Sequence, residues 1–140
     1  MGTEENKKLV RRYYKEIVST GDVVGISEFI SPEYTEVHEG IRHRIGIDGA
    51  RDHIAGVRGT YPDLKLKVEQ QIAEGEWVVS RVMMRGTHEG EWMEIRPTGK
   101  TVEIRAVNID RVVEGRIVEH GGAANMLEPL LRIGAIRIVR

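Results

Sequence analysis

The spacing of apolar residues changes once along this chain, at Tyr61-Pro62-Asp63, and this change constrains the fold more than any other feature. Before it, apolar residues recur at helical intervals. After it they alternate with polar residues, beginning with Leu64, Leu66 and Val68. Since a period of two is typical of half-buried strands, helices come first and strands follow. We expect an α+β fold in which an antiparallel meander curls around helices and leaves a pocket between the two layers.

Four segments carry the apolar spacing and the end signals of helices. Glycine ends the first segment, and proline ends the second because the residue before proline avoids the helical conformation. Two glycines weaken the third. The expected helices run from Thr3 up to Gly21, from Asp22 up to Ser31-Pro32, over Gly49–Arg58 and over Ala123–Ile133.

Turns that contain glycine divide the second half of the chain into strands. They lie at Glu74-Gly75, Pro97-Thr98-Gly99 and Glu114-Gly115. Glycine in such short loops supplies the positive φ angles that tight turns need. The expected strands are Lys65–Ala73, Trp77–Arg85, a strand near Glu91–Ile95, Thr101–Val113 and Arg116–His120.

Composition narrows the possible functions. The 140 residues fit one domain over positions 1–140. A formal net charge of -1 gives no field that would attract nucleic acid or a membrane surface, and no apolar stretch is long enough to span a bilayer. We therefore expect a cytoplasmic protein with a small-molecule ligand. The absence of cysteine excludes thiolate catalysis and disulfides, and an aromatic content of 5% predicts a core built from Val, Ile and Leu.

Familiar catalytic motifs fail on inspection. Gly99-Lys100-Thr101 resembles the end of a phosphate-binding loop, but Glu94 occupies the position of the required first glycine. His38 and His43 are one residue too far apart for a zincin helix, which Gly40 would interrupt in any case. No nucleophilic serine motif occurs. We expect no metal site and no covalent catalysis.

One face of the strand Thr101–Val113 changes from apolar to polar along its length, reaching Asn108 and Asp110. The partner of Asp110 depends on the following turn. A two-residue turn would place it opposite Glu119, an unfavourable pair of like charges. A three-residue turn would place it opposite His120, with Asn108 near Gly122 and Val112 against Val118. We prefer the second register, which gathers Asn108, Asp110 and His120 on one face.

These polar residues have a structural interpretation beside the functional one. Asp110 and His120 could form a buried pair that only fixes the register of the strands, and such pairs are commoner than catalytic ones. Tyr14 lies on an apolar helix face, where core packing is the first interpretation, although its hydroxyl could line a pocket. His38, His88 and Trp92 are the other candidate ligand contacts.

With these residues in view, the chain resembles the SnoaL-like polyketide cyclase (ester cyclase) family of the NTF2-like superfamily, from about Glu5 to Ile136. The resemblance rests on several short segments in a characteristic order and spacing. They are Tyr61-Pro62-Asp63-Leu64, Ile72-Ala73-Glu74-Gly75, Gly86-Thr87-His88-Glu89-Gly90, Arg96-Pro97-Thr98-Gly99-Lys100, Asn108-Ile109-Asp110-Arg111, Gly115-Arg116-Ile117-Val118-Glu119-His120 and Leu130-Leu131-Arg132-Ile133-Gly134-Ala135.

The resemblance implies a cone-shaped, strongly curved sheet wrapped around N-terminal helices, with dimers formed through the sheet. Family cyclases close a ring by intramolecular aldol condensation without a cofactor, using a carboxylate as acid and base. Carried over by position, that aspartate falls on Gly122, and the tryptophan beside it falls on Gly121. Ala106 and Asn108 take the places of an amide and a histidine.

Two main hypotheses follow, beside a third possibility of isomerase- or hydrolase-like chemistry that rests on analogy of fold alone. The first is a cofactor-free acid/base enzyme that acts on a small carbon acid or ester, with Asp110, His120 and Asn108 replacing the lost aspartate. The second is a ligand-binding or dimerisation module without catalysis, in which Gly121-Gly122 widens the cavity. The position of Asp110 and His120 relative to the cavity distinguishes them.

Overall fold

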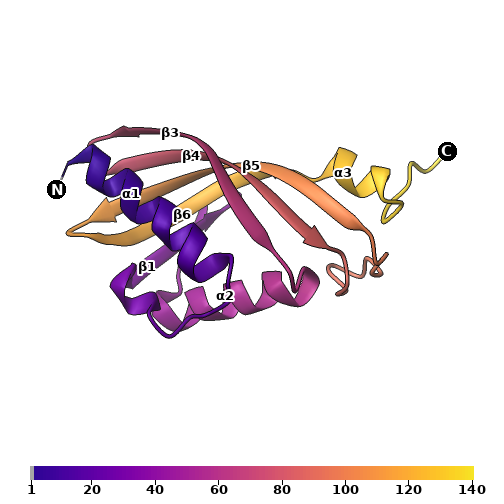
Figure 1. The fold of residues 1–140 in the computed structure, drawn as a ribbon, viewed down its shortest axis with the longest axis horizontal. Helices are drawn as coiled ribbons and strands as arrows, with labels where there is room; N and C mark the ends of the chain where they lie inside the picture. Colours follow the sequence, from indigo (N-terminus) through magenta and orange to yellow (C-terminus); the bar gives the residue numbers. More distant parts are fainter. Residues whose placement is uncertain (1) are drawn as a thin grey trace.

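A computed structural model describes residues 2–140 of the protein. In it, one six-stranded sheet curves over helices α1 and α2 (Figure 1). The strand order is β2-β1-β6-β5-β4-β3. Helices α1 and α2 lie under the concave face of the sheet, and the C-terminal helix α3 lies near one end of β5 and β6. The elements in chain order are α1 (Thr3–Tyr13), η1 (Tyr14–Val18), η2 (Ile26–Glu28), β1 (Ile30–His38), β2 (Ile41–Arg44), α2 (Gly46–Thr60), β3 (Lys65–Glu74), β4 (Trp77–Thr87), β5 (Thr101–Val113), β6 (Arg116–Asn125) and α3 (Leu127–Arg132).

The segment after Asp22 is where the sequence-based prediction is most wrong. Only a short 3-10 turn, η2, forms there, and β1 and β2 follow it. Pro32, which was expected to end a helix, lies inside β1 where its register with β6 shifts, between Ile30 and Thr35. A proline is tolerated at such an irregularity because no ladder hydrogen bond needs its missing N–H. Since β1 and β6 run parallel, the sheet is mixed rather than wholly antiparallel.

The predicted strands Lys65–Ala73, Trp77–Arg85 and Thr101–Val113 are confirmed as β3, β4 and β5. A strand near Glu91–Ile95 does not form, and only a single bridge joins Trp92 and Ile95. The last helix is shorter than expected because β6 continues along β5 as far as Asn125, which pairs with Arg105.

The preferred register of β5 and β6 is correct, but for a different reason. Asp110 lies opposite His120, and Asn108 lies opposite Gly122. The turn itself has two residues, Glu114 and Gly115, both with positive φ. A bulge then leaves Val118 unpaired, since Arg111 faces Glu119 and Val112 faces Ile117. The extra residue of the bulge therefore moves Asp110 away from Glu119 and onto His120. The expected contact of Val112 with Val118 is wrong.

Aromatic residues contribute more to the core than the composition predicts. The core contains the expected aliphatic residues, but five of the seven aromatic side chains are buried with them. These five are Tyr13, Tyr14, Phe29, Tyr34 and Tyr61. Scarce aromatic residues are thus concentrated between the helices and the sheet, next to the space where a ligand would lie.

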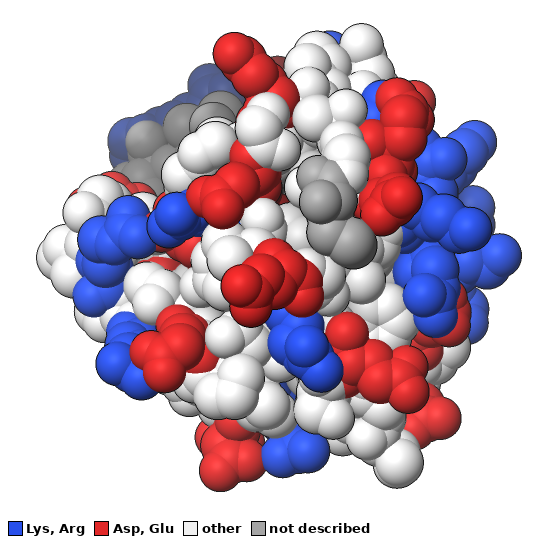
Figure 2. Space-filling view, turned by 90° about the vertical axis from the view of Figure 1, so that its left-hand side faces the viewer, with Lys and Arg blue, Asp and Glu red and all other residues white. Residues whose placement is uncertain are grey.

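The surface mixes charges of both signs. On the face at the left of Figure 1, acidic and basic side chains are interspersed, although basic ones gather toward one edge (Figure 2). Neither sign dominates this face, in line with the net charge of -1. Among residues 2–140, no helix combines the length and the apolar character needed to cross a bilayer.

Candidate functional site

A cavity of about 690 Å³ lies between the concave face of the sheet and the helices. Its walls are mainly aliphatic, and five aromatic side chains also line it: Tyr13, Tyr14, Tyr34, Tyr61 and Trp92. Small-molecule sites typically enclose about 300–1,000 Å³ and combine apolar walls with a few polar groups. In both size and lining this cavity resembles such a site.

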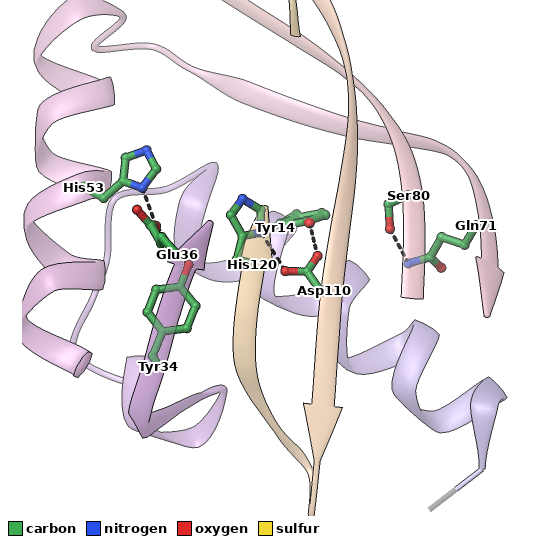
Figure 3. Close-up of polar contacts among 8 residues, drawn as sticks. All are labelled: Tyr14, Tyr34, Glu36, His53, Gln71, Ser80, Asp110 and His120. Atoms are coloured by element: carbon green, nitrogen blue, oxygen red, sulfur yellow. Dashed lines mark hydrogen bonds and ion pairs between the residues drawn. The ribbon is translucent and has the colours of Figure 1, made fainter. Parts of the chain in front are cut away.

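The strongest polar constellation at the cavity joins Asp110, His120 and Tyr14 (Figure 3). Asp110 on β5 is completely buried, and its Oδ1 lies 2.6 Å from His120 Nδ1. Its Oδ2 accepts a hydrogen bond from the Tyr14 hydroxyl. His120 and Tyr14 line the cavity, whereas Asp110 lies behind them. Each carboxylate oxygen therefore has a partner, as a buried charge requires.

A change in helix geometry brings Tyr14 into this position. Tyr14 begins a π-helical turn that continues α1, and the Ser19 amide donates to the Tyr14 carbonyl at 2.9 Å. The Ser19 hydroxyl donates to the same carbonyl at 2.7 Å. Such wider turns are frequent at functional sites. Here the turn accompanies the burial of two consecutive tyrosines, Tyr13 and Tyr14, which both line the cavity.

The residues around His120 and its burial shift the pKa of its imidazole. Burial lowers the pKa of His120, but the charge and the hydrogen bond of Asp110 outweigh burial, with a further contribution from the charge of Glu36, and the pKa is raised above 6.5. Burial and the neighbouring carboxylate of Asp110 hold the pKa of the Tyr14 hydroxyl well above 10. Tyr14 therefore remains a hydrogen-bond donor near neutral pH. With Nδ1 held by Asp110, His120 has Nε2 available for a ligand.

Asn108 lines the cavity opposite Gly122, as predicted. A Cβ atom at Gly122 would lie 2.6 Å from both Asn108 Oδ1 and the carbonyl oxygen of Val107. The carbonyl belongs to the backbone and cannot turn away, so this strand pair has no room for a side chain at position 122. Asn108 occupies that space from the neighbouring strand.

The other sequence-predicted residues divide between the cavity and a loop. His38 and Trp92 line the cavity. His88 does not: it is 1% exposed, its Nδ1 accepts a hydrogen bond from the Thr98 amide at 3.3 Å, and its ring packs against Tyr61. The structure therefore does not bring His88, one of the candidate ligand contacts, to the cavity. A histidine in this position closes the base of the loop between β4 and β5.

A second polar group of the cavity, which was not predicted from the sequence, consists of Tyr34, Glu36 and His53. Glu36 Oε2 accepts a hydrogen bond from the Tyr34 hydroxyl at 3.0 Å and lies 2.5 Å from His53 Nδ1. Burial raises the pKa of the Glu36 carboxyl, but His53 and Tyr34 reverse the shift, so the pKa is lowered. The missed signal is the alternation of Tyr34, Glu36 and His38, which places all three on one face of β1.

Among residues 2–140, no group of three or more His, Asp or Glu side chains is arranged to hold a metal ion. The polar groups of the cavity instead form two separate carboxylate–histidine pairs. Such pairs can accept and donate protons, and each carboxylate fixes the orientation of its imidazole.

Comparison with known proteins gives consistent results. Aklanonic acid methyl ester cyclase AcmA of Streptomyces galilaeus is 27% identical over 109 residues, which cover 75% of this chain and 74% of that protein. Nogalonic acid methyl ester cyclase of Streptomyces nogalater is 28% identical over 105 residues, which cover 73% of this chain and 78% of that protein.

Among solved structures, AclR of Streptomyces galilaeus, a proposed hydroxylase, has a TM-score of 0.82 and 29% identity, covering 99% of this chain and 91% of its own. A SnoaL-like polyketide cyclase from Agrobacterium tumefaciens shares the fold, with a TM-score of 0.77, 16% identity and coverage of 94% and 98%. The sequence model of SnoaL-like polyketide cyclases matches residues 8–132, which is most of the chain. This chain belongs to the SnoaL-like polyketide cyclase family.

Proposed function

We propose that this protein is a cofactor-free acid/base enzyme that removes a proton from an activated carbon of a small ester or ketone. The observation that carries the proposal is the pair of His120 and the fully buried Asp110 at the wall of a largely apolar cavity. Neutral His120 would take the proton on Nε2, and the Asp110 carboxylate would stabilise the imidazolium that forms.

The substrate class follows from the cavity and from the relatives. Apolar and aromatic walls favour a ligand with a carbon skeleton, and 690 Å³ gives room for a fused-ring molecule. Two relatives are cyclases of the methyl esters of aklanonic acid and nogalonic acid, as their names state. An ester or ketone with an acidic C–H bond suits both observations, because its carbanion is stabilised by a neighbouring carbonyl.

Asn108 supports the same chemistry in another way. Its side-chain amide lines the cavity two residues before Asp110 on β5. The amide nitrogen carries two donors, which suit the oxygen on which negative charge develops when a C–H bond ionises. In this proposal Asp110, His120 and Asn108 together take over the role of the family aspartate that the resemblance places at Gly122.

The proposal is tested by proton exchange rather than by a single product. Aklanonic acid methyl ester and nogalonic acid methyl ester, incubated with the protein in D₂O, should gain deuterium at a carbon next to a carbonyl group, as measured by mass spectrometry. His120→Gln should lose this exchange, and His43→Gln, which changes an exposed β2 histidine outside the cavity lining, should keep it. Binding of the esters without exchange by the wild-type protein would favour the binding-module alternative.

A further inference from the structure

The second polar group of the cavity lies beside His120, and the proposed function assigns it no step beyond the contribution of the Glu36 charge to the pKa of His120. Glu36 on β1 and His120 on β6 are directly paired across the parallel strands, so their side chains project from the same face of the sheet. Figure 3 shows the Glu36–His53 pair next to the Asp110–His120 pair. All of these residues except Asp110 line the same cavity.

The histidine side chains of the two pairs differ in how far they are exposed to solvent. His120 is largely buried, with 21% of its side chain exposed, and its carboxylate partner is inaccessible. The His53 side chain is 49% exposed and comes from α2, across the cavity wall from β6. A half-exposed imidazole can exchange protons with water between turnovers, whereas a buried one keeps the proton that it has taken for longer.

Glu36 is equipped to orient His53. Its Oε2 accepts a hydrogen bond from the Tyr34 hydroxyl at 3.0 Å and lies 2.5 Å from His53 Nδ1. Burial of the Tyr34 hydroxyl, together with the neighbouring charges, raises its pKa far above the ordinary value of 10, so Tyr34 acts only as a donor to Glu36. When His53 is protonated, its Nδ1–H is engaged by Glu36, and Nε2–H is the group that can donate a proton to a ligand.

We infer that Glu36–His53 is a second proton-transfer pair, in which His53 is the general acid that protonates the oxygen of the enolate generated by His120. His53 is then a catalytic residue, and Glu36 and Tyr34 are positioning residues. This inference rests on the function proposed above and extends it from one proton-transfer group to two.

The proton and electron balance is complete without a cofactor. His120 Nε2 takes the proton of the activated carbon, and the C–H electron pair forms the new C=C bond. The carbonyl π pair moves to oxygen, which takes the proton from His53 Nε2. The substrate is converted from its keto to its enol form, with no net gain or loss of protons. His120 ends as imidazolium and His53 as neutral imidazole, and the starting states return by exchange with water.

The test compares three variants in the D₂O exchange assay with aklanonic acid methyl ester as the probe. General acid catalysis contributes about 10²–10⁴-fold to rate, so His53→Gln should lower kcat by about 100-fold or more while KM changes little. Glu36→Gln should lower kcat in the same direction, and the double variant should be no slower than His53→Gln alone. The matched control is Asp52→Asn, an exposed α2 neighbour outside the cavity lining, which should keep the wild-type kcat.

The outcomes separate this inference from the proposed function. If the wild-type protein exchanges deuterium and His120→Gln abolishes exchange while His53→Gln and Glu36→Gln keep the wild-type kcat, the second pair has no catalytic role. A rise in KM with unchanged kcat would also overturn the inference, because it indicates ligand contact alone. A wild-type protein without exchange refutes both ideas together. Thermal unfolding of each variant confirms that it is folded, and Glu36→Gln provides the same test if His53→Gln is unstable.

Discussion

Replacing Asp110 by Asn changes the chemistry of His120 while keeping almost the same shape, and it tests the site at its most buried point. The amide of the Asp110→Asn variant would keep one oxygen for the Tyr14 hydroxyl, which now contacts Asp110 Oδ2. Its NH₂ group would lie where Oδ1 now lies, 2.6 Å from His120 Nδ1. Because an amide nitrogen only donates, Nδ1 would become an acceptor and the ring proton would move to Nε2. The nitrogen available to substrate would then no longer be a base.

The Asp110→Asn substitution should change both the pKa of His120 and the kcat of the exchange reaction. Burial is already the largest single influence on the imidazole, and in Asp110→Asn the charge that outweighs it is gone, so the pKa of His120 should fall from above 6.5 to below it. Each pKa unit corresponds to about 1.36 kcal/mol of differential interaction between the two protonation states. Loss of a correctly oriented general base should lower kcat by about 10²–10⁴-fold.

Long-range ¹H–¹⁵N NMR of the imidazole rings, recorded between pH 5 and 9, reports both the pKa and the tautomer. The chain has five histidines, and His120→Gln assigns the signal of interest by its disappearance. The exchange assay on the same samples gives kcat. The reasoning is refuted if Asp110→Asn keeps a His120 pKa above 6.5, keeps the Nδ1–H tautomer, or exchanges deuterium at the wild-type rate.

Four further outcomes are expected. Tyr14→Phe leaves Asp110 Oδ2 without a partner and should lower the free energy of unfolding by about 1–3 kcal/mol, measured by urea titration; an unchanged value would contradict the burial argument. Because the pKa of His120 is raised in the fold, its positive charge beside Asp110 contributes stability that is fully present below pH 6.5 and is lost as pH rises through the folded pKa, while the neutral ring keeps its Nδ1–H hydrogen bond. The Tm difference between wild type and His120→Gln should therefore shrink from pH 6 to pH 9, and a constant difference would count against the shift. Gly122→Asp should lower stability by about 1–3 kcal/mol, since its Cβ meets the Val107 carbonyl, and an equally stable variant would show that the strands can separate. The outer sheet face exposes Ile109 by 43%, and we expect dimers through this face; light scattering should detect a dimer that Ile109→Arg converts to a monomer.

Most strands after Asp63 could be predicted from sequence, although the one expected near Glu91–Ile95 does not form, whereas the segment before α2 could not be predicted. The alternation of Leu66 and Val68 with polar residues predicts β3 correctly because this strand is half buried on one face. In the 22–44 region, by contrast, Pro32 favours a helix end, while the strand that actually contains it is held by pairing with β6, far along the chain. The pattern of apolar and polar residues within a segment does not predict its pairing with a strand far along the chain.

The same distinction explains which site residues were found. Asp110, His120 and Asn108 share a hairpin, so avoiding the like-charge pair of Asp110 and Glu119 was enough to predict that they lie together. Glu36 and His53 reach the cavity through the parallel β1–β6 pairing and through the packing of α2 against β1, neither of which the sequence pattern specifies.

The pairing of residues within the hairpin depended on the bulge at Val118, which no turn motif announces. The prediction of the register was right because it avoided placing Asp110 opposite Glu119. The repulsion between two like charges in a buried position therefore predicted the register of β5 and β6 better than the assumed length of the turn did.

Whether His120 is the base of this cavity can be read from a crystal structure of the wild-type protein with aklanonic acid methyl ester bound. We expect the acidic carbon at about 3–3.5 Å from His120 Nε2, the range of near-attack geometries, with its carbonyl oxygen facing Asn108 or His53. An ester bound in the cavity with its acidic carbon beyond reach of His120, or bound only on the outer face of the sheet, would contradict this role for His120.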